Sequence, residues 1–441
     1  MKPQITRISG AGAPVLVAGL TLLVAQLAAS CGGTKDPRPG RSDDAPSTTD
    51  DGPGGQTGTG GRGQGGEFNL GGSNTVEICG EAPDTNGAFS KKALLAAAAD
   101  CSAYQACGFR AAAVVLQREL KGWAEDPSGE NLGRARAAYD NAMNEWSSIE
   151  GLQFGPVADG PVDEYHGRGI RTKIHPWPST NRCNVETQIS TQEYASADGF
   201  KYVPPSGRGL FAIEYVLFTN YSDTVCAANQ QAYADWNALS SSELAAAKRS
   251  YAVAVASDVV RLADTLVGVW APDGENFKAK LLAFDGYGSE QETLNIVAWS
   301  LIYPEAEIKD WKLGPFSTVP VTPASIGPET PYSLRGIENL RVNLRAFEML
   351  FWGCRGGEGL GFDDWLTEAG AADLRDDIRA AYEQAALAAD AFPAMQDATT
   401  AEFDDFYRAI KPLADLLKSS FFGSGSPLNL KLPASAGSDT D

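Results

Sequence analysis

Gly209-Leu-Phe-Ala-Ile-Glu-Tyr-Val-Leu-Phe218 is the stretch from which we interpret the whole chain. It follows the breaker-rich run Pro204-Pro-Ser-Gly-Arg-Gly209 and is apolar except at Glu214. It predicts a buried helix on which Phe211 and Glu214 lie one turn apart on the same face. A buried carboxylate needs a cation, a metal ion or several hydrogen-bond donors. Glu214 is therefore either a functional acid or a structural polar anchor.

Helical patterns cover most of the rest of the chain, and the alternation typical of strands is scarce. We predict an all-α fold of two helical bundles that pack together, with residues 76–240 in the first half and 241–423 in the second. A disordered tail is expected at 424–441. The clearest predicted helices are Ala88–Trp123, Leu132–Ile149, Ser241–Trp270, Leu334–Trp352, Phe362–Phe392 and Thr400–Phe421.

A weak internal repeat would fit two halves of similar design. Ala212–Phe218 can be aligned with Ala346-Phe-Glu-Met-Leu-Phe-Trp352, which places Glu214 on Glu348. Chance similarity of two apolar helices is the competing explanation. If the repeat is real, the bundles meet near the two glutamates.

The net charge excludes one class of partner. The chain of 441 residues carries 36 basic and 56 acidic side chains, a formal charge of -20. Nucleic-acid-binding proteins normally carry the opposite sign. We therefore predict no nucleic-acid partner.

The N-terminus predicts export and lipid anchoring over residues 1–31. Lys2 and Arg7 precede an apolar stretch at 15–29, as in a signal peptide. Leu27-Ala-Ala-Ser-Cys31 resembles a bacterial lipobox, in which Cys31 would be lipidated; ordinary cleavage nearby is the alternative. Residues 32–75 are rich in Gly, Ser, Thr, Asp and Pro, which predicts a flexible linker. Gly32 rather than Asp favours the outer membrane, so we expect an envelope protein facing the periplasm or the cell surface.

The other six cysteines predict up to three disulfides in an oxidising compartment. Cys101 and Cys107 would be about 9 Å apart along one helix, too far to bridge each other. Each then needs a distant partner, with Cys79 and Cys354 as candidates, and the connectivity stays open. The full set of candidates is Cys79, Cys101, Cys107, Cys183, Cys226 and Cys354.

The two histidines give no metal-binding pattern. His166 lies in a Gly-rich stretch, and His175 precedes Pro176, which favours extended backbone. Neither has a second ligand at helical spacing, and no Cys-x-x-Cys pair is present, so a zinc cluster is not expected.

Three blocks resemble the imelysin family. They are Trp146-Ser-Ser-Ile-Glu-Gly-Leu-Gln-Phe-Gly-Pro156, Ile174-His-Pro-Trp-Pro178 and the Gly209–Phe218 stretch. The resemblance covers about Ala88 to Phe421. It implies an exported, often lipid-anchored bacterial protein with two helical halves and an association with iron uptake. A few members of the family are classed as metallopeptidases.

The chain departs from the family motif at one position. In Gly-x-His-x-x-Glu, the Gly is Gly209 and the Glu is Glu214, but Phe211 replaces the His. Phenylalanine has no lone pair to offer a metal, and one carboxylate rarely holds a transition metal alone. The metallopeptidase activity implied by the family is therefore poorly supported.

We predict a non-catalytic protein that binds a ligand or an envelope partner at the cleft between the bundles, without a resident cofactor or metal. Glu214 would be buried and paired with an Arg from the second half. Arg341 and Arg345 share a helix face with Glu338 and Glu348, for which surface ion pairs are the simpler explanation. Two alternatives stay open: a metallopeptidase whose metal is held by Glu214, Glu348 and one loop histidine, and a carboxylate-only binder of iron or another divalent cation. The candidate ligand-binding residues are Gly209, Phe211, Glu214, Arg345 and Glu348.

Overall fold

Several helices in this chain begin where a side chain accepts a free backbone N–H group of the first turn. The structure, a computed structural model, describes residues 79–158, 167–196, 198–319 and 326–433. Within these ranges the regular elements are all helical, which confirms the expected all-α class. Ser90 caps the longest helix by accepting from Ala93 N at 3.1 Å, and Ser240 forms a capping box with Glu243. The predicted signal segment, Cys31 and the linker lie outside the described ranges.

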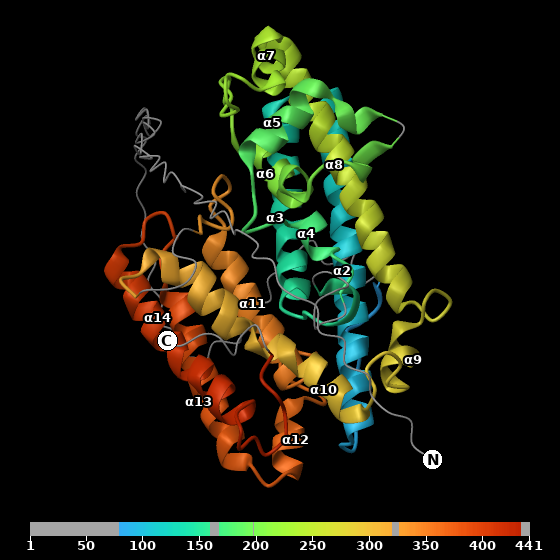
Figure 1. The fold of residues 1–441 in the computed structure, drawn as a ribbon, viewed down its shortest axis with the longest axis vertical. Helices are drawn as coiled ribbons and strands as arrows, with labels where there is room; N and C mark the ends of the chain where they lie inside the picture. Colours follow the sequence, from blue (N-terminus) through green and yellow to red (C-terminus); the bar gives the residue numbers. More distant parts are fainter. Residues whose placement is uncertain (1–78, 159–166, 197, 320–325, 434–441) are drawn as a thin grey trace, which may run out of the picture. The chain divides into compact units, whose positions relative to one another are not determined.

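The first bundle consists of four helices, shown in blue to yellow in Figure 1, with α2 packed on α3 and α8, and α6 packed on α3 and α8. Their bounds are α2 Lys91–Glu125, α3 Gly129–Glu150, α6 Gly209–Phe218 and α8 Ser241–Trp270. Shorter helices connect them: α4 Arg171–Ile174, α5 Arg182–Thr191 and α7 Gln231–Ala238. The short helix α9, Phe277–Leu282, follows α8 and contacts α2.

The position of α8 corrects the boundary that we predicted at residue 240. This helix follows the boundary in sequence but packs along α2 and α6, so it completes the first bundle. Its buried face, which includes Tyr251, Val255 and Leu262, needs apolar partners, and these helices supply them. The chain therefore passes from the first bundle to the second only after α8.

The second bundle, in orange and red in Figure 1, combines a π-helix, η6, with three α-helices. Both η6 and α13 pack on α14 and α11. The bounds are η6 Pro304–Leu313, α11 Gly336–Phe351, α13 Ala372–Ala391 and α14 Thr400–Leu416. Three further helices are α10 Glu290–Ala298, α12 Phe362–Glu368 and the short π-helix η8 Leu417–Phe421.

The two bundles meet where α3 lies against α11. Contact is close at Gly151, just after α3, where an added Cβ would come within 2.5 Å of the Cβ of Ala346. The described residues form three disulfides, and one of them, Cys101–Cys354, joins α2 to the residues just after α11. The other two are Cys79–Cys107 and Cys183–Cys226, so Cys101 and Cys107 each have a distant partner as predicted.

The C-terminal segment corrects a second prediction, that of a disordered tail from residue 424. Residues 424–433 pack on the fold, with Leu428 and Leu430 buried. The indole N–H of Trp299 donates to the carbonyl of Lys431 at 2.7 Å, and Gln291 donates to the carbonyls of Leu428 and Asn429. Residues 434–441 lie outside the described ranges.

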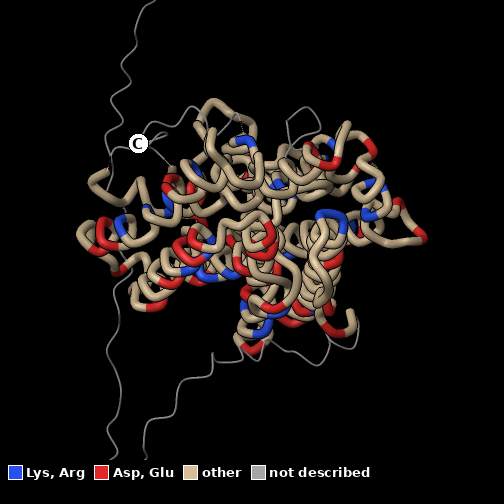
Figure 2. The backbone as a smooth tube through the Cα atoms, turned by 90° about the horizontal axis from the view of Figure 1, so that it is seen from below, with Lys and Arg blue, Asp and Glu red and all other residues tan. Residues whose placement is uncertain are grey.

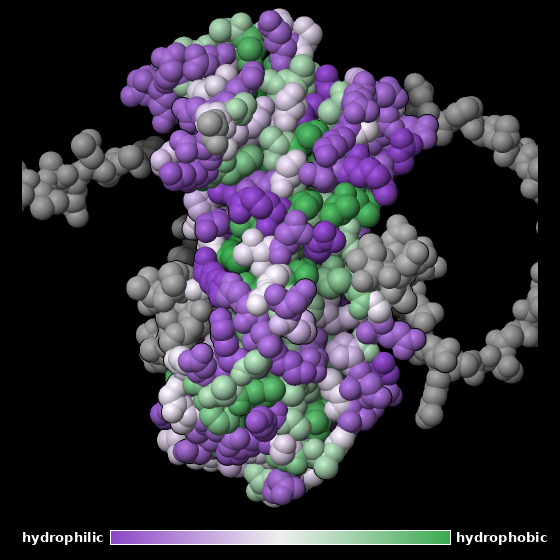
Figure 3. Space-filling view, turned by 90° about the vertical axis from the view of Figure 1, so that its right-hand side faces the viewer, coloured by the Kyte–Doolittle hydropathy of each residue, from purple (hydrophilic) through white to green (hydrophobic). Residues whose placement is uncertain are grey.

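Acidic residues outnumber basic ones in the sequence, and both kinds are distributed over the helices (Figure 2). Asp and Glu are spread over the helices with Lys and Arg between them (Figure 2), and apolar residues on the face in Figure 3 are scattered among polar ones. Among the described residues, no helix is both long enough and apolar enough to cross a bilayer.

Candidate functional site at the bundle junction

Glu214 is completely buried on α6. Donors from residues 326–335, the segment before α11 that we call the connector, surround one of its oxygens. The backbone N–H groups of Tyr332 and Ser333 donate to Oε1 at 3.0 and 2.7 Å, and the Ser333 hydroxyl donates at 2.8 Å. Oε2 has no hydrogen-bond partner among the described residues. The expected pairing with an arginine of the second half is therefore wrong, and backbone amides take that role.

Gly209 positions the start of α6 directly against the α4 segment. Its φ is +70°, in the left-handed region, and an added Cβ would lie 2.2 Å from the carbonyl oxygen of Ile174. Only glycine combines this backbone conformation with such a close approach. The family glycine thus places α6 beside the residue that follows Ile174, which is His175.

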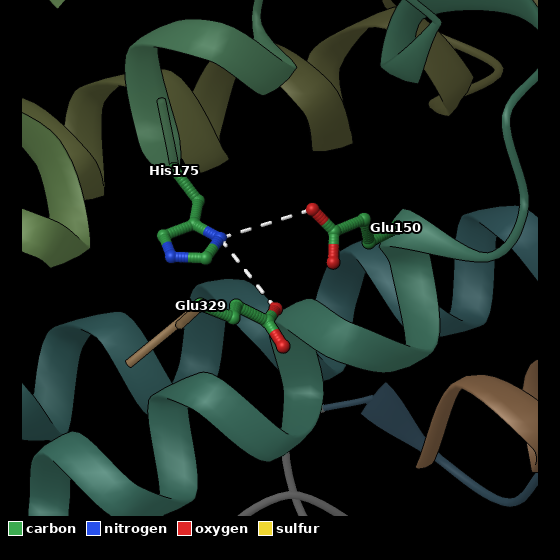
Figure 4. Close-up of side chains that lie close together, drawn as sticks. All are labelled: Glu150, His175 and Glu329. Atoms are coloured by element: carbon green, nitrogen blue, oxygen red, sulfur yellow. Dashed lines mark ion pairs between the residues drawn. The ribbon is translucent and has the colours of Figure 1, made fainter. Parts of the chain in front are cut away.

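His175 lies between two buried carboxylates from distant parts of the chain (Figure 4). Its Nδ1 is 3.8 Å from Glu150 Oε1 at the end of α3 and 4.0 Å from Glu329 Oε1 in the connector. All three side chains are at most 4% exposed. One donor atom from each lies within 4.8 Å of the others, an arrangement that can converge on one metal ion.

Lys312 of η6 lies on the other side of the same carboxylates. Its Nζ is 2.9 Å from Glu329 Oε2 and 3.8 Å from Glu150 Oε2, and it donates to Asn343 Oδ1 at 2.7 Å. The amide of Asn343 in turn donates to the carbonyl of Ser147 on α3. The ammonium group thus links both bundles through the cluster.

A second buried pair extends this cluster. Arg171 of α4 forms a short ion pair with Glu307 of η6 and lies 3.5 Å from Glu150 Oε1. Gln153 donates to Glu307 at 2.6 Å, and the Tyr303 hydroxyl donates to Glu150 at 3.2 Å. We call Glu150, Arg171, His175, Glu214, Glu307, Lys312 and Glu329 the junction cluster.

The surroundings of these carboxyl groups shift their pKa values in different directions. Burial raises the pKa of Glu150, but Lys312, His175 and Arg171 outweigh it and hold that pKa well below its ordinary value. Burial raises the pKa of Glu307, and Arg171 only partly offsets this effect. Burial also raises the pKa of Glu214 to about 7, against the lowering effect of its hydrogen bonds from Ser333 and Tyr332.

The junction cluster has donor atoms and negative charge that would suit a cation. Four of its buried polar atoms have no hydrogen-bond partner among the described residues. They are both ring nitrogens of His175, Oε2 of Glu214 and Oε1 of Glu329. The cluster holds four carboxyl groups against the cations Arg171 and Lys312. Burying uncompensated negative charge is costly. An N and O donor set of one imidazole and carboxylates fits iron, zinc or manganese.

The other predicted site residues lie elsewhere or contribute packing. The Phe211 ring is buried and packs on Tyr332, with ring centroids 6.0 Å apart. Glu348 accepts from the Tyr382 hydroxyl at 3.2 Å, and Arg345 lines a separate pocket between α3 and α11. Neither of these two is a partner of Glu214, and His166 lies outside the described residues.

Residue spacing did not indicate Glu150, His175 or Glu329 as a group. They come from three segments, separated by 25 residues (175 − 150) and 154 residues (329 − 175), so no short motif contains them. The signals present were indirect: both Glu150 and His175 fall within blocks that resemble the imelysin family, and His175 is fixed by the following Pro176.

The fold and the junction cluster define a helical protein with two bundles and a buried polar centre between them. Residues 104–419 match the Imelysin family, and the chain belongs to this family. It is 26% identical over 210 residues to iron-regulated protein A of Synechococcus elongatus, a match that spans 46% of this chain and 49% of that relative. The chain thus spans about half the length of this curated relative.

Two solved structures share the fold at low identity. An imelysin-like protein from Psychrobacter arcticum has a TM-score of 0.59 and 16% identity, covering 79% of this chain and 99% of that one. A protein described as an iron-regulated protein A precursor from Parabacteroides distasonis has a TM-score of 0.53 and 14% identity, covering 77% and 97%. These two likenesses show the fold alone.

Proposed function

We propose that this imelysin-family chain is a lipid-anchored envelope protein that binds a transition-metal cation, iron above all, at the junction cluster without catalysing a reaction. The observation that carries the proposal is the convergence of Glu150, His175 and Glu329 within 4.8 Å in a buried site. The name of the Synechococcus relative supports the link to iron. The lipobox-like sequence at Cys31 supports the anchor.

The proposed ligands compensate for the missing histidine of the family motif. Phe211 cannot bind a metal, but His175 is close enough to Glu214 for its charge to lower the pKa of that carboxyl group. An imidazole therefore reaches the same region from α4 rather than from α6. Glu150 and Glu329 would complete the donor set, and Glu214 would contribute its second oxygen or accept a hydrogen bond from bound water.

The ammonium group of Lys312 would compete with a bound metal cation for Glu329 and Glu150. It already neutralises part of Glu329 and Glu150, so a metal would share these carboxylates with the ammonium group or displace it. Ligands must be deprotonated to bind, so affinity should fall as pH falls. Binding energy would also stabilise the fold, because both bundles supply ligands.

The test is metal binding to the purified chain after removal of bound metal, by calorimetry with Fe(II), Mn(II) and Zn(II). We expect one equivalent to bind and to raise Tm. His175→Ala and Glu150→Gln should each weaken binding by at least about tenfold, the loss that follows even from removing an outer-shell partner. Glu130→Gln is the matched control, because Glu130 is on the same helix but exposed.

The proposal is wrong if no metal binds, or if Glu150→Gln and Glu130→Gln affect binding equally. In that case the junction cluster is a structural ion-pair network, and its variants lose stability whether or not metal is present.

A metallopeptidase is the second candidate, and one observation favours it. Glu214 has a pKa raised to about 7 and one oxygen without a partner, properties of a general base near neutral pH. The same metal-loaded protein should then hydrolyse an unfolded protein substrate, and Glu214→Gln should abolish hydrolysis while keeping the metal. Metal binding without hydrolysis would leave only the binding function.

A further inference from the structure

A pocket of about 200 Å³ lies between α3 and α11, outside the junction cluster. Its walls carry charged groups of both signs. From α3 come Asn144 and Glu145, and from α11 and the residue before it come Arg335, Glu338, Arg341 and Arg345. It has space for about six molecules of water, each of which takes about 30 Å³.

Its positive side has one uncommitted guanidinium group. Arg341 donates to the carbonyls of Ala389, Asp390 and Phe392, so it is held at the end of α13. Arg345 has neither a hydrogen-bond partner nor an ion-pair partner among the described residues. Arg335 pairs with Asp140 at 3.2 Å and donates to Asn144. Glu348 and Asp390 act on the charge of Arg345 without a hydrogen bond or ion pair to it, so its guanidinium group can still donate to an anionic ligand.

Its negative side has two carboxyl groups without cationic partners. Glu145 forms no hydrogen bond or ion pair within the described part of the chain, and burial raises its pKa to about 7. Oε2 of Glu338 is buried and has no hydrogen-bond partner there. Such groups are more stable when a cation faces them.

Arg345 and the two glutamates of this pocket do not form ion pairs with one another. The sequence pattern suggested ion pairs along the α11 face, yet Arg345 does not pair with Glu338 or with Glu145, although all three line one pocket. Opposite charges that share a pocket without touching can both be satisfied by a ligand that carries both signs.

We propose that the α3–α11 pocket binds a small zwitterion of the α-amino acid class, with its carboxylate on Arg345 and its ammonium group at Glu145 and Glu338. A guanidinium group can hold a carboxylate through two parallel hydrogen bonds. The pocket volume fits a free amino acid better than a longer peptide. This site is independent of the cation site proposed above.

The experiment is calorimetric titration of the whole folded chain with alanine and glutamate, and with acetate and methylammonium as fragments of single charge. The amino acids should bind at least tenfold more tightly than either fragment. Arg345→Gln and Glu145→Gln should each weaken amino-acid binding by at least tenfold. Arg408→Gln, at an exposed arginine of α14 paired with Asp405, should leave it unchanged.

Three outcomes would overturn the proposal. One is no binding of any amino acid. Another is acetate binding as tightly as alanine with no effect of Glu145→Gln, which would mean a simple anion site. The third is an equal loss of binding in Arg408→Gln. Circular dichroism of each variant checks that the fold is intact, so that lost binding reports on the pocket.

Discussion

Glu214, the glutamate of the family motif, holds the connector against α6. Its first oxygen accepts three hydrogen bonds from Tyr332 and Ser333, so it fixes the connector to α6. Burial nevertheless dominates and raises its pKa to about 7. The carboxylate is therefore destabilised in the folded state at neutral pH unless a cation approaches it.

This predicts a pH dependence of stability with a definite sign. A carboxyl pKa that is higher in the folded state makes the folded chain hold its proton more tightly. The wild type should thus lose stability as pH rises from about 4.5, the ordinary value, to about 7. Glu214→Gln does not titrate, so its free energy of unfolding relative to wild type should increase over this range by up to about 3 kcal/mol.

The measurement is urea denaturation at several pH values in the presence of a chelator, with Glu130→Gln as control. A difference between Glu214→Gln and wild type that does not change with pH would show that Glu214 titrates normally.

At the scale of elements, the contact between α6 and α4 depends on Gly209. Gly209→Ala places a methyl group 2.2 Å from the Ile174 carbonyl at a φ of +70°. We expect a loss of about 3 kcal/mol or more from overpacking and backbone strain. Gly133→Ala is the matched control: Gly133 is an exposed position of α3 with nothing within 4 Å of an added Cβ, so the variant should gain about 0.5–1 kcal/mol.

Urea denaturation compares the two variants. If Gly209→Ala is as stable as wild type, the close approach of α6 to α4 is not required, and the family glycine has another role.

The elements also show what could be predicted from sequence. The apolar run from Gly209 to Phe218 forms α6 with the predicted bounds, because a continuous apolar stretch after breakers leaves little choice. The sequence does not show that α8 belongs to the first bundle, because an amphipathic face does not specify which helices it packs against. The helix expected at 362–392 is divided into α12 and α13 at Gly370, where φ is +74°.

The candidate site was harder to predict than the fold. Glu214 was recognised as a buried acid because one charge interrupts an apolar helix, but its amide partners come from the connector 118 residues away. The sequence around His175 does not indicate a metal site, because its neighbours in sequence offer no second ligand. Its neighbours in space, Glu150 and Glu329, depend on how the two bundles meet.

At the scale of the whole molecule, lipid anchoring at Cys31 remains a prediction. Acylation would bury hydrocarbon at about 0.8 kcal/mol per CH₂, so the mature chain should partition with membranes. Cys31→Ser should move the protein from the membrane fraction to the soluble envelope fraction without changing its Tm. Fractionation of cells with immunodetection measures this, and equal partitioning of both forms would contradict the anchor.

The order of the helices has a further consequence for the intact molecule. The chain passes from one bundle to the other once, after α8, and Cys101–Cys354 joins the same two bundles covalently. A protease that cuts between α8 and α10 would therefore leave the two fragments attached. In an oxidising envelope the protein could be nicked there and still keep Glu150 and His175 opposite Glu329, and only reduction would allow the fragments to separate.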